Sequence, residues 1–239
     1  MSSSSTVGSD KNAAAVRGRF ITLEGSEGVG KTTNLAVIRE WLVGRGVDLV
    51  VTREPGGTAL GERLRSVLLE VSADAHEPAM SDMAELLLMF AARAQHIQQV
   101  IEPALAAGQW VLSDRFTDAT YAYQGAGRGI PKEHIDTLQT LVQGELRPDK
   151  TLYLDLDPAV AFERISDRAH DRIEQEQLDF FQRIRACYLQ RAQDEPQRYV
   201  VIDAGVDKDQ VATRVRASLA EGLAEAVDDR QEGVRDATK

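Results

Sequence analysis

Short apolar runs alternate with longer amphipathic stretches along the chain. Each run is rich in β-branched or other apolar residues, which is typical of a buried strand. The runs are FITLE from Phe20, DLVVT from Asp48, WVLS from Trp110, TLYLDLDP from Thr151 and YVVID from Tyr199. The stretches between the runs have helical length and periodicity. Strands that alternate with helices favour an α/β fold in which a five-stranded parallel sheet carries helices on both faces.

Capping residues and helix breakers set the expected limits of the helices. Ser81 suits an N-cap and Gly108 suits a stop, so we expect one long helix between them, over about 81–107. Pro131 and Pro158 suit the first turn of a helix. The segment GAGRGIP, which ends at Pro131, is expected to be a flexible turn. Further helices are expected at about 31–44, at 60–71, up to about 195, and after the fifth strand.

The length and composition fit one domain. The chain has 239 residues, 43% of them hydrophobic, which is enough for a single α/β domain with a sizeable core. We find no repeat and no internal linker. We therefore assign the domain to 19–222. The small, polar residues 1–18 are predicted to be a disordered tail, and the polar residues 223–239 are predicted to fray.

Charge and cysteine content exclude several classes of function. A formal net charge of −10 argues against a broad nucleic-acid-binding face, which is usually basic. No run approaches the roughly 18–20 apolar residues of a membrane span, so we expect no membrane partner. The single cysteine, Cys187, cannot form an internal disulfide and suits a reducing compartment such as the cytoplasm. Its place in an amphipathic stretch predicts a small buried hydrophobe.

A glycine-rich loop follows the first predicted strand. The segment GSEGVGKTT fits the pattern G-x-x-x-x-G-K-[ST], in which backbone N–H groups and a helix N-terminus converge on phosphates. Lys31 is expected to reach the β- and γ-phosphates, and the Thr32 hydroxyl is expected to bind Mg²⁺. The loop predicts a nucleoside triphosphate site, but motors, switches, ATPases and kinases all use it. The predicted site comprises Gly25, Ser26, Glu27, Gly28, Val29, Gly30, Lys31, Thr32 and Thr33.

Three further stretches narrow the class. They are TREPGGT from Thr52, DRFTDATYAYQGAGRG from Asp114 and DRIEQE from Asp171. With the phosphate loop, they closely resemble the bacterial thymidylate kinases over about residues 19–215. The resemblance implies the three-layer P-loop kinase fold with a short arginine-rich lid at about 164–176. It also implies ATP and dTMP as substrates, Mg²⁺ as cofactor, dTDP as product on the route to dTTP, and a homodimer.

Glu27 is an unexpected residue for a phosphate loop. A carboxylate there would repel the β- and γ-phosphates if it faced them. The resemblance implies that Glu27 instead faces the acceptor nucleotide, near the sugar or its magnesium. A solvated loop carboxylate is the alternative.

The resemblance also implies a pocket for the thymine base. Phe90 and Arg93 are three residues apart and share a helix face. The resemblance implies that Phe90 stacks on thymine and that Arg93 donates to a ring carbonyl, although the sequence alone would place Phe90 in the core. Thr120 and Gln124 would share one side of a short helix. Tyr123 is expected either to pack under the sugar or to lie in the core.

Charged residues after the second and third strands are candidates for the phosphates and the metal. Asp114 ends an apolar strand, as Mg²⁺-linked acids in P-loop proteins often do. Arg115 next to it is expected to hold the acceptor phosphate. Arg53 and Glu54 resemble a family pair near the acceptor. Arg65 is a further phosphate candidate, with an exposed helix arginine as the alternative.

The lid sequence ERISDRAHDR carries three arginines. The resemblance implies that lid arginines supply positive charge at the transferring phosphoryl group, and both Arg168 and Arg172 remain candidates. With Lys31 and Arg115 they form the predicted catalytic set. A rival acid pair at the end of the fourth strand, Asp155 and Asp157, is interpreted as structural.

Two alternative functions stay open. A kinase for another nucleoside monophosphate, such as dUMP, would need a similar base pocket. A P-loop switch or partition ATPase could share GVGKTT. Such proteins tend to carry a lysine where this chain has Ser26, and they would lack the TREPGG and AYQG stretches.

Overall fold

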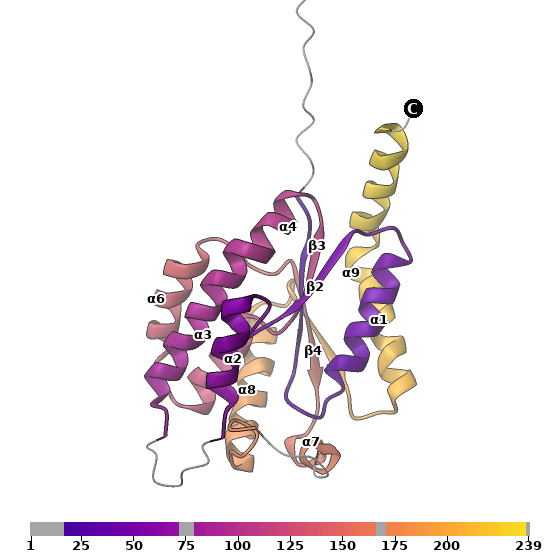
Figure 1. Cartoon of the computed structure of the whole chain (residues 1–239). Coiled ribbons are helices and arrows are strands. Elements are labelled where there is room, and N and C mark those ends of the chain that lie inside the picture. The colour runs from indigo at the N-terminus through magenta and orange to yellow at the C-terminus, as the bar shows by residue number, and fades with distance from the viewer. Residues whose placement is uncertain (1–16, 72–78, 166–170, 238–239) are drawn as a thin grey trace, which may run out of the picture.

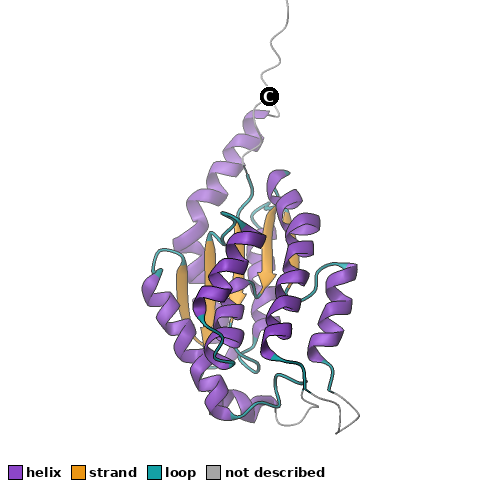
Figure 2. Ribbon diagram, turned by 90° about the vertical axis from the view of Figure 1, so that its left-hand side faces the viewer, coloured by secondary structure: helices purple, strands orange, loops and turns teal. Residues whose placement is uncertain are grey.

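All five expected strands form one parallel sheet. The structure, a computed structural model, describes residues 17–71, 79–165 and 171–237. The strands are β1 (Phe20–Glu24), β2 (Leu49–Arg53), β3 (Trp110–Asp114), β4 (Lys150–Asp155) and β5 (Tyr199–Asp203). Their order in the sheet is β2-β3-β1-β4-β5, so the strand that precedes the glycine loop is central. Figure 2 shows the strands side by side, with helices in front of them and behind them.

Helices cover both faces of this sheet, which confirms the predicted three-layer fold. α1 and α9 lie on one face, and α2, α3, α4, α6 and α8 lie on the other (Figure 1). The α-helices are α1 (Lys31–Val43), α2 (Ala59–Leu69), α3 (Asp82–His96), α4 (Glu102–Ala106), α5 (Thr117–Thr120), α6 (Lys132–Gln143), α7 (Pro158–Ile165), α8 (Leu178–Asp194) and α9 (Lys208–Ala237). Two π-helical segments are η1 (Ile97–Ile101) and η2 (Tyr121–Gly127).

The expected long helix is present but changes its hydrogen-bond pattern. Ser81 caps it, since its hydroxyl accepts from Ala84 N at 3.3 Å, and Gly108 ends it with φ of 78°. Between α3 and α4 the backbone widens into η1. Pro103 follows and has no N–H to bond the carbonyl four residues earlier, which favours a local departure from α-helical bonding.

The segment expected to be a flexible turn is hydrogen-bonded in its first half. Residues 125–127 belong to η2, which Arg128 closes by donating its backbone N–H to Tyr123 O at 2.9 Å. Gly127 is required there, because a Cβ would lie 2.5 Å from the Phe180 ring. Close packing of α8 on η2 therefore orders a glycine-rich segment that the sequence alone marks as mobile.

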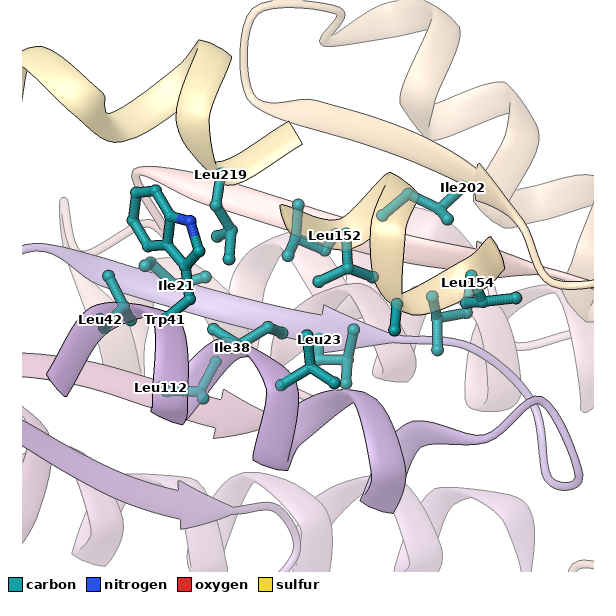
Figure 3. Packing of buried hydrophobic residues seen from close by; sticks show 14 of the residues in the cluster. Ile21, Leu23, Ile38, Trp41, Leu42, Leu112, Leu152, Leu154, Ile202 and Leu219 are labelled. Atoms are coloured by element: carbon teal, nitrogen blue, oxygen red, sulfur yellow. The ribbon is translucent and has the colours of Figure 1, made fainter. Parts of the chain in front are cut away.

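The largest core cluster lies between the sheet and the α1–α9 layer (Figure 3). Trp41 from α1 and Leu219 from α9 pack there against strand residues such as Ile21. The same cluster includes Leu223 and Val227, which are 5% and 1% exposed. The helix and core thus continue beyond residue 222, where the sequence predicts a polar tail.

The predicted N-terminal tail lies, for residues 1–16, outside the described residues. Among the helices of the described part, none combines the length and apolar character needed to span a membrane. Cys187 is partly buried on α8 and packs against a core cluster.

The topology brings two loops together at the carboxyl edge of the sheet. β1 pairs with β3, with Leu23 opposite Asp114. The glycine loop leaves β1 and Arg115 follows β3, so both emerge from neighbouring strands. Parallel α/β sheets place their ligand sites at this edge.

Candidate active site

A cavity of about 1200 Å³ runs along the carboxyl edge of the sheet. It extends from residues beyond the glycine loop, past the loop, to side chains that follow β2 and β3 and to side chains of α3. Most of the predicted site residues line it: Glu27, Gly28, Val29, Gly30, Lys31, Thr32, Thr33, Arg53, Glu54, Arg65, Arg93, Asp114, Arg115, Thr120, Tyr123 and Gln124.

The glycine loop has the backbone conformation that a phosphate cradle needs. Gly28 has φ of 76°, and a Cβ there would lie 2.5 Å from Ala161 O, so only glycine fits. The Lys31 ammonium donates to Gly25 O at 3.1 Å and to Ser26 O at 2.8 Å. Gly25 and Ser26 thus support Lys31 rather than lining the cavity. Burial, together with repulsion from Arg115, lowers the pKa of Lys31 to about 8.

Glu27 pairs with two residues that follow β3. Its carboxylate accepts from Arg115, and the Tyr123 hydroxyl donates to Glu27 Oε2 at 2.9 Å. Burial alone would raise the pKa of Glu27, but Arg115 and Lys31 together hold it below its usual value. The carboxylate is therefore ionised and already matched by a cation, which removes the repulsion expected from a carboxylate facing the phosphates.

Arg115 is held at a strained backbone position. Its φ is 70°, in the left-handed region that non-glycine residues rarely adopt. Three bonds fix the turn: Arg115 N donates to Leu23 O at 3.0 Å, Ser113 Oγ donates to Arg115 O at 2.7 Å, and Phe116 N donates to Glu24 Oε1 at 2.8 Å. The guanidinium also donates to Gly25 O. The turn thus points the Arg115 side chain across the loop into the cavity.

At the opposite end of the cavity, Arg93 lies in a buried polar group. Its Nε donates to Glu54 Oε2 at 2.8 Å and its Nη2 donates to Thr120 Oγ1 at 3.0 Å. The guanidinium lies 4.8 Å from the Phe90 ring centroid and 5.1 Å from that of Phe116. Arg93 and Thr120, predicted to act together, are therefore in direct contact.

The structure corrects the position of Phe90. The ring is 2% exposed and packs with Leu86, Tyr121 and neighbouring apolar residues, and it does not line the cavity. Met89 lines the cavity instead. On a helix, positions three and four before Arg93 both lie near its face, and the prediction chose the aromatic one. Phe90 supports Arg93 from behind, and Met89 is the apolar surface open to a ligand.

Gln124 and Arg172 meet at a buried carboxylate. Glu85 is 1% exposed and accepts from Gln124 Nε2 at 2.7 Å and from Arg172 Nη2 at 2.5 Å. Arg172 also donates to Leu68 O at 2.9 Å and does not line the cavity. It therefore ties the segment before α8 to α2 and α3, in contrast to the predicted role at the phosphoryl group. Arg168 lies outside the described residues.

Oxygen ligands suited to a hard cation lie beside the glycine loop. Asp114 lines the cavity, and its Oδ1 is buried without a hydrogen-bond partner among the described residues. The Thr32 side chain is exposed in the first turn of α1, on the same cavity. A carboxylate and a hydroxyl of this kind fit Mg²⁺. By contrast, Asp155 accepts from Arg185 at 2.8 and 2.9 Å. This ion pair agrees with the prediction that Asp155 has a structural role.

Arg53 and Arg65 stand on the wall between the two ends. Arg53 pairs with Glu62 at 2.7 Å, and Arg65 donates to Pro55 O at 3.0 Å. Both line the cavity, which favours the proposed phosphate role of Arg65 over that of an arginine pointing only to solvent.

Sequence reasoning missed one end of the cavity. Beyond the glycine loop it is lined by residues of α1, α7 and the β5–α9 connection: Asn34, Arg164, Ala204, Val206, Asp207 and Lys208. Arg164 crosses this end and donates to Ala204 O at 3.2 Å. The position of the fifth strand end, at the same edge of the sheet as the loop, is the signal that could have identified it.

Comparison with known proteins identifies the family of the chain. Residues 23–215 match the family model described as thymidylate kinase. The chain is 55% identical over 203 residues to the thymidylate kinase of Teredinibacter turnerae, covering 84% of this chain and 97% of that protein. It is 57% identical over 189 residues to that of Chromobacterium violaceum, covering 79% and 87%. A crystal structure of Ehrlichia chaffeensis thymidylate kinase superposes with a TM-score of 0.69 at 32% identity, covering 87% of this chain and 99% of that one. The chain therefore belongs to the thymidylate kinase family.

Proposed function

We propose that the chain transfers the γ-phosphoryl group of ATP to dTMP, giving dTDP and ADP on the route to dTTP. As a thymidylate kinase family member it is a nucleotide-binding transferase. The observation that carries the proposal is the continuity of the cavity, which connects the glycine loop to the buried Arg93 group. Two nucleotides bound at its ends would meet between Lys31 and Arg115.

ATP would occupy the half formed by the glycine loop. Its phosphates would lie against the backbone N–H groups of the loop and the N-terminus of α1, with Lys31 at the β- and γ-phosphates. The rest of the nucleotide would extend towards Arg164 and the β5–α9 connection, which line that end of the cavity.

dTMP would occupy the other half. Arg93 would donate to a carbonyl of the base, with Gln124 at the base edge and Met89 as an apolar contact. The Glu27 and Tyr123 pair would lie near the sugar. Arg115 would bind the acceptor phosphate, with Arg53, Glu54 and Arg65 along the wall, because a guanidinium fork suits phosphate oxygens.

The reaction needs no general base. The second pKa of a phosphate monoester is near 6, so dTMP is mostly dianionic at neutral pH and its oxygen is already a nucleophile. The protein would therefore act by aligning the two phosphates. Lys31 and Arg115 would stabilise the negative charge on the transferring phosphoryl group. Thr32 and Asp114 would hold a Mg²⁺ ion, which neutralises charge on the β- and γ-phosphates when it is bound.

The proposal includes a homodimer in the cytoplasm. Exposed apolar side chains on the neighbouring helices α2 and α3 support a second copy as partner, namely Leu60, Val67, Met83 and Leu87. The single cysteine supports a reducing compartment, and the acidic net charge argues against a nucleic-acid partner.

An ADP-release assay with each nucleoside monophosphate in turn tests the function. We expect turnover with ATP and dTMP and much less with other acceptors. A higher kcat/KM for dUMP than for dTMP would favour the other nucleotide kinase. ADP release that does not depend on any acceptor would favour an ATPase.

A further inference from the structure

Behind Arg93, a buried histidine connects the acceptor end of the cavity to β2. His96 lies one turn after Arg93 on α3 and is fully buried. Its Nδ1 lies 2.9 Å from Glu54 Oε1, and its Nε2 lies 2.6 Å from Thr52 Oγ1. Glu54 uses its other oxygen, Oε2, to accept from Arg93. Contacts thus run from Thr52 through His96 and Glu54 to Arg93.

The neighbours of His96 indicate which ring nitrogen donates a hydrogen bond and which accepts one. A carboxylate oxygen only accepts, so Nδ1 carries a proton and donates to Glu54. In the neutral ring, Nε2 then accepts a hydrogen bond from the Thr52 hydroxyl. Each oxygen of the Glu54 carboxylate therefore has its own donor, one from His96 and one from Arg93.

The chain closes tightly on this ring. A Cβ at Gly57 would lie 2.7 Å from His96 Nε2 and 2.6 Å from Thr52 Oγ1. Gly57 also has φ of 76°, so the backbone after β2 requires glycine on both counts. The TREPGG segment thus passes close to the imidazole, and a side chain at position 57 would clash with it.

The division of the Glu54 carboxylate matters for Arg93. Glu54 Oε1 faces His96 and Oε2 accepts from Arg93 Nε at 2.8 Å, so the guanidinium gives one bond to this carboxylate while its Nη2 donates to Thr120 at 3.0 Å. Nη1 is buried and has no hydrogen-bond partner in the part of the chain that the structure describes. Because Arg93 lines the cavity, a ligand oxygen bound there is a candidate partner for Nη1.

We infer that His96 is a positioning residue for recognition of the acceptor base. It holds Glu54 so that Glu54 fixes Arg93 through one bond, and Arg93 keeps Nη1 for a base carbonyl. The inference rests on the proposed function, in which the Arg93 end of the cavity binds the pyrimidine of dTMP. His96 itself does not line the cavity, so it acts through Glu54 and Arg93.

Two amide substitutions separate the two hydrogen bonds of His96. In His96→Asn the amide nitrogen is as many bonds from Cβ as Nδ1, so the donor to Glu54 is kept. In His96→Gln the amide nitrogen takes the place of Nε2, next to Thr52, and Glu54 Oε1 loses its donor. Both variants bring an amide of similar polarity to the same buried site, which makes them matched controls for each other.

Steady-state kinetics of the full chain, with dTMP and ATP varied in turn, test the inference. We expect His96→Gln to raise the KM for dTMP about tenfold, as for a lost hydrogen bond to a charged group, while the KM for ATP changes less than about twofold. We expect His96→Asn to keep the KM for dTMP within about threefold of the wild type. Thermal unfolding confirms that each variant is folded.

The inference would be overturned if the two variants had equal KM values for dTMP. It would also be overturned if His96→Gln raised the KM for ATP as much as the KM for dTMP. Thr52→Val is a second route that leaves the imidazole in place and covers the case in which His96→Gln does not fold. It removes the donor that fixes Nε2 as acceptor, and we expect a rise of about threefold in the KM for dTMP. An unchanged KM there would also overturn the inference. Wild-type protein that releases no ADP with dTMP would instead refute the proposed function, without any variant.

Discussion

Replacing Phe90 by alanine separates a core residue from a base-stacking residue. Phe90 is 2% exposed and packs in a small cluster with Leu86, Tyr121, Ile130 and Ile135. Truncation of a buried phenylalanine costs about 3–5 kcal/mol of unfolding free energy, and the cost is lower where neighbours can move into the space. Because this cluster is small, we expect about 3 kcal/mol.

The expected loss converts to a measurable shift. For a domain of this size each kcal/mol lowers Tm by about 2–4 °C, so Phe90→Ala should lower Tm by about 6–12 °C. Met89→Ala is the matched control one position away. Met89 is only partly buried and lines the cavity, so we expect Met89→Ala to lower the free energy of unfolding by only about 1 kcal/mol. We expect the same change to raise the KM for dTMP clearly.

Thermal denaturation followed by circular dichroism gives Tm, and the ADP-release assay gives KM for each substrate. The reasoning would be refuted if Phe90→Ala kept its Tm and raised the KM for dTMP while Met89→Ala left that KM unchanged. That result would return Phe90 to the base-stacking role implied by the resemblance.

Four further predictions concern the charged groups of the cavity. Lys31→Ala should lower kcat at least about a hundredfold without lowering Tm; near-normal turnover would contradict the phosphate role. Since the pKa of Lys31 is lowered to about 8, its positive charge is lost above that pH, so kcat/KM for ATP should fall above about pH 8. Glu27→Gln should raise the KM for dTMP more than that for ATP; equal changes in titrations of both ligands would count against it. Arg115→Met should lower kcat about a hundredfold or more. Arg172→Met should lower kcat less than about tenfold, because Arg172 bonds Glu85 and does not itself line the cavity; a larger loss in single-turnover rates would restore a catalytic role to Arg172.

The sheet and the glycine loop could be predicted because their signals are local. Each strand is a short apolar run, and the loop is a contiguous pattern between a strand and a helix. Glycines and prolines also placed most helix ends within a few residues. The extent of α9 was missed because Val215, Leu219, Leu223 and Val227 are single apolar positions four residues apart in a polar sequence, and only packing against α1 reveals them as one face.

The side-chain network could be predicted only in part. Arg93 and Thr120 were named together, but nothing local distinguishes Met89 from Phe90, because both lie about one turn from Arg93. Arg172 looks like a free cation in the sequence, and its partner Glu85 lies 87 positions away. Ion pairs between residues far apart in the sequence are set by the tertiary fold. Composition and spacing therefore predict the net charge of a site, but they do not predict which charged side chains pair with each other.

The pairing of β1 with β3 has a consequence for how variable this enzyme can be. Hydrogen-bonded neighbouring strands are about 4.8 Å apart, and this spacing is fixed by the backbone rather than by side chains. Leu23 and Asp114 are opposite each other in that ladder, so the loop that follows β1 and the arginine that follows β3 start from fixed points. Changes in other connections can therefore alter access to the cavity while the separation between the start of the glycine loop and Arg115 stays constant.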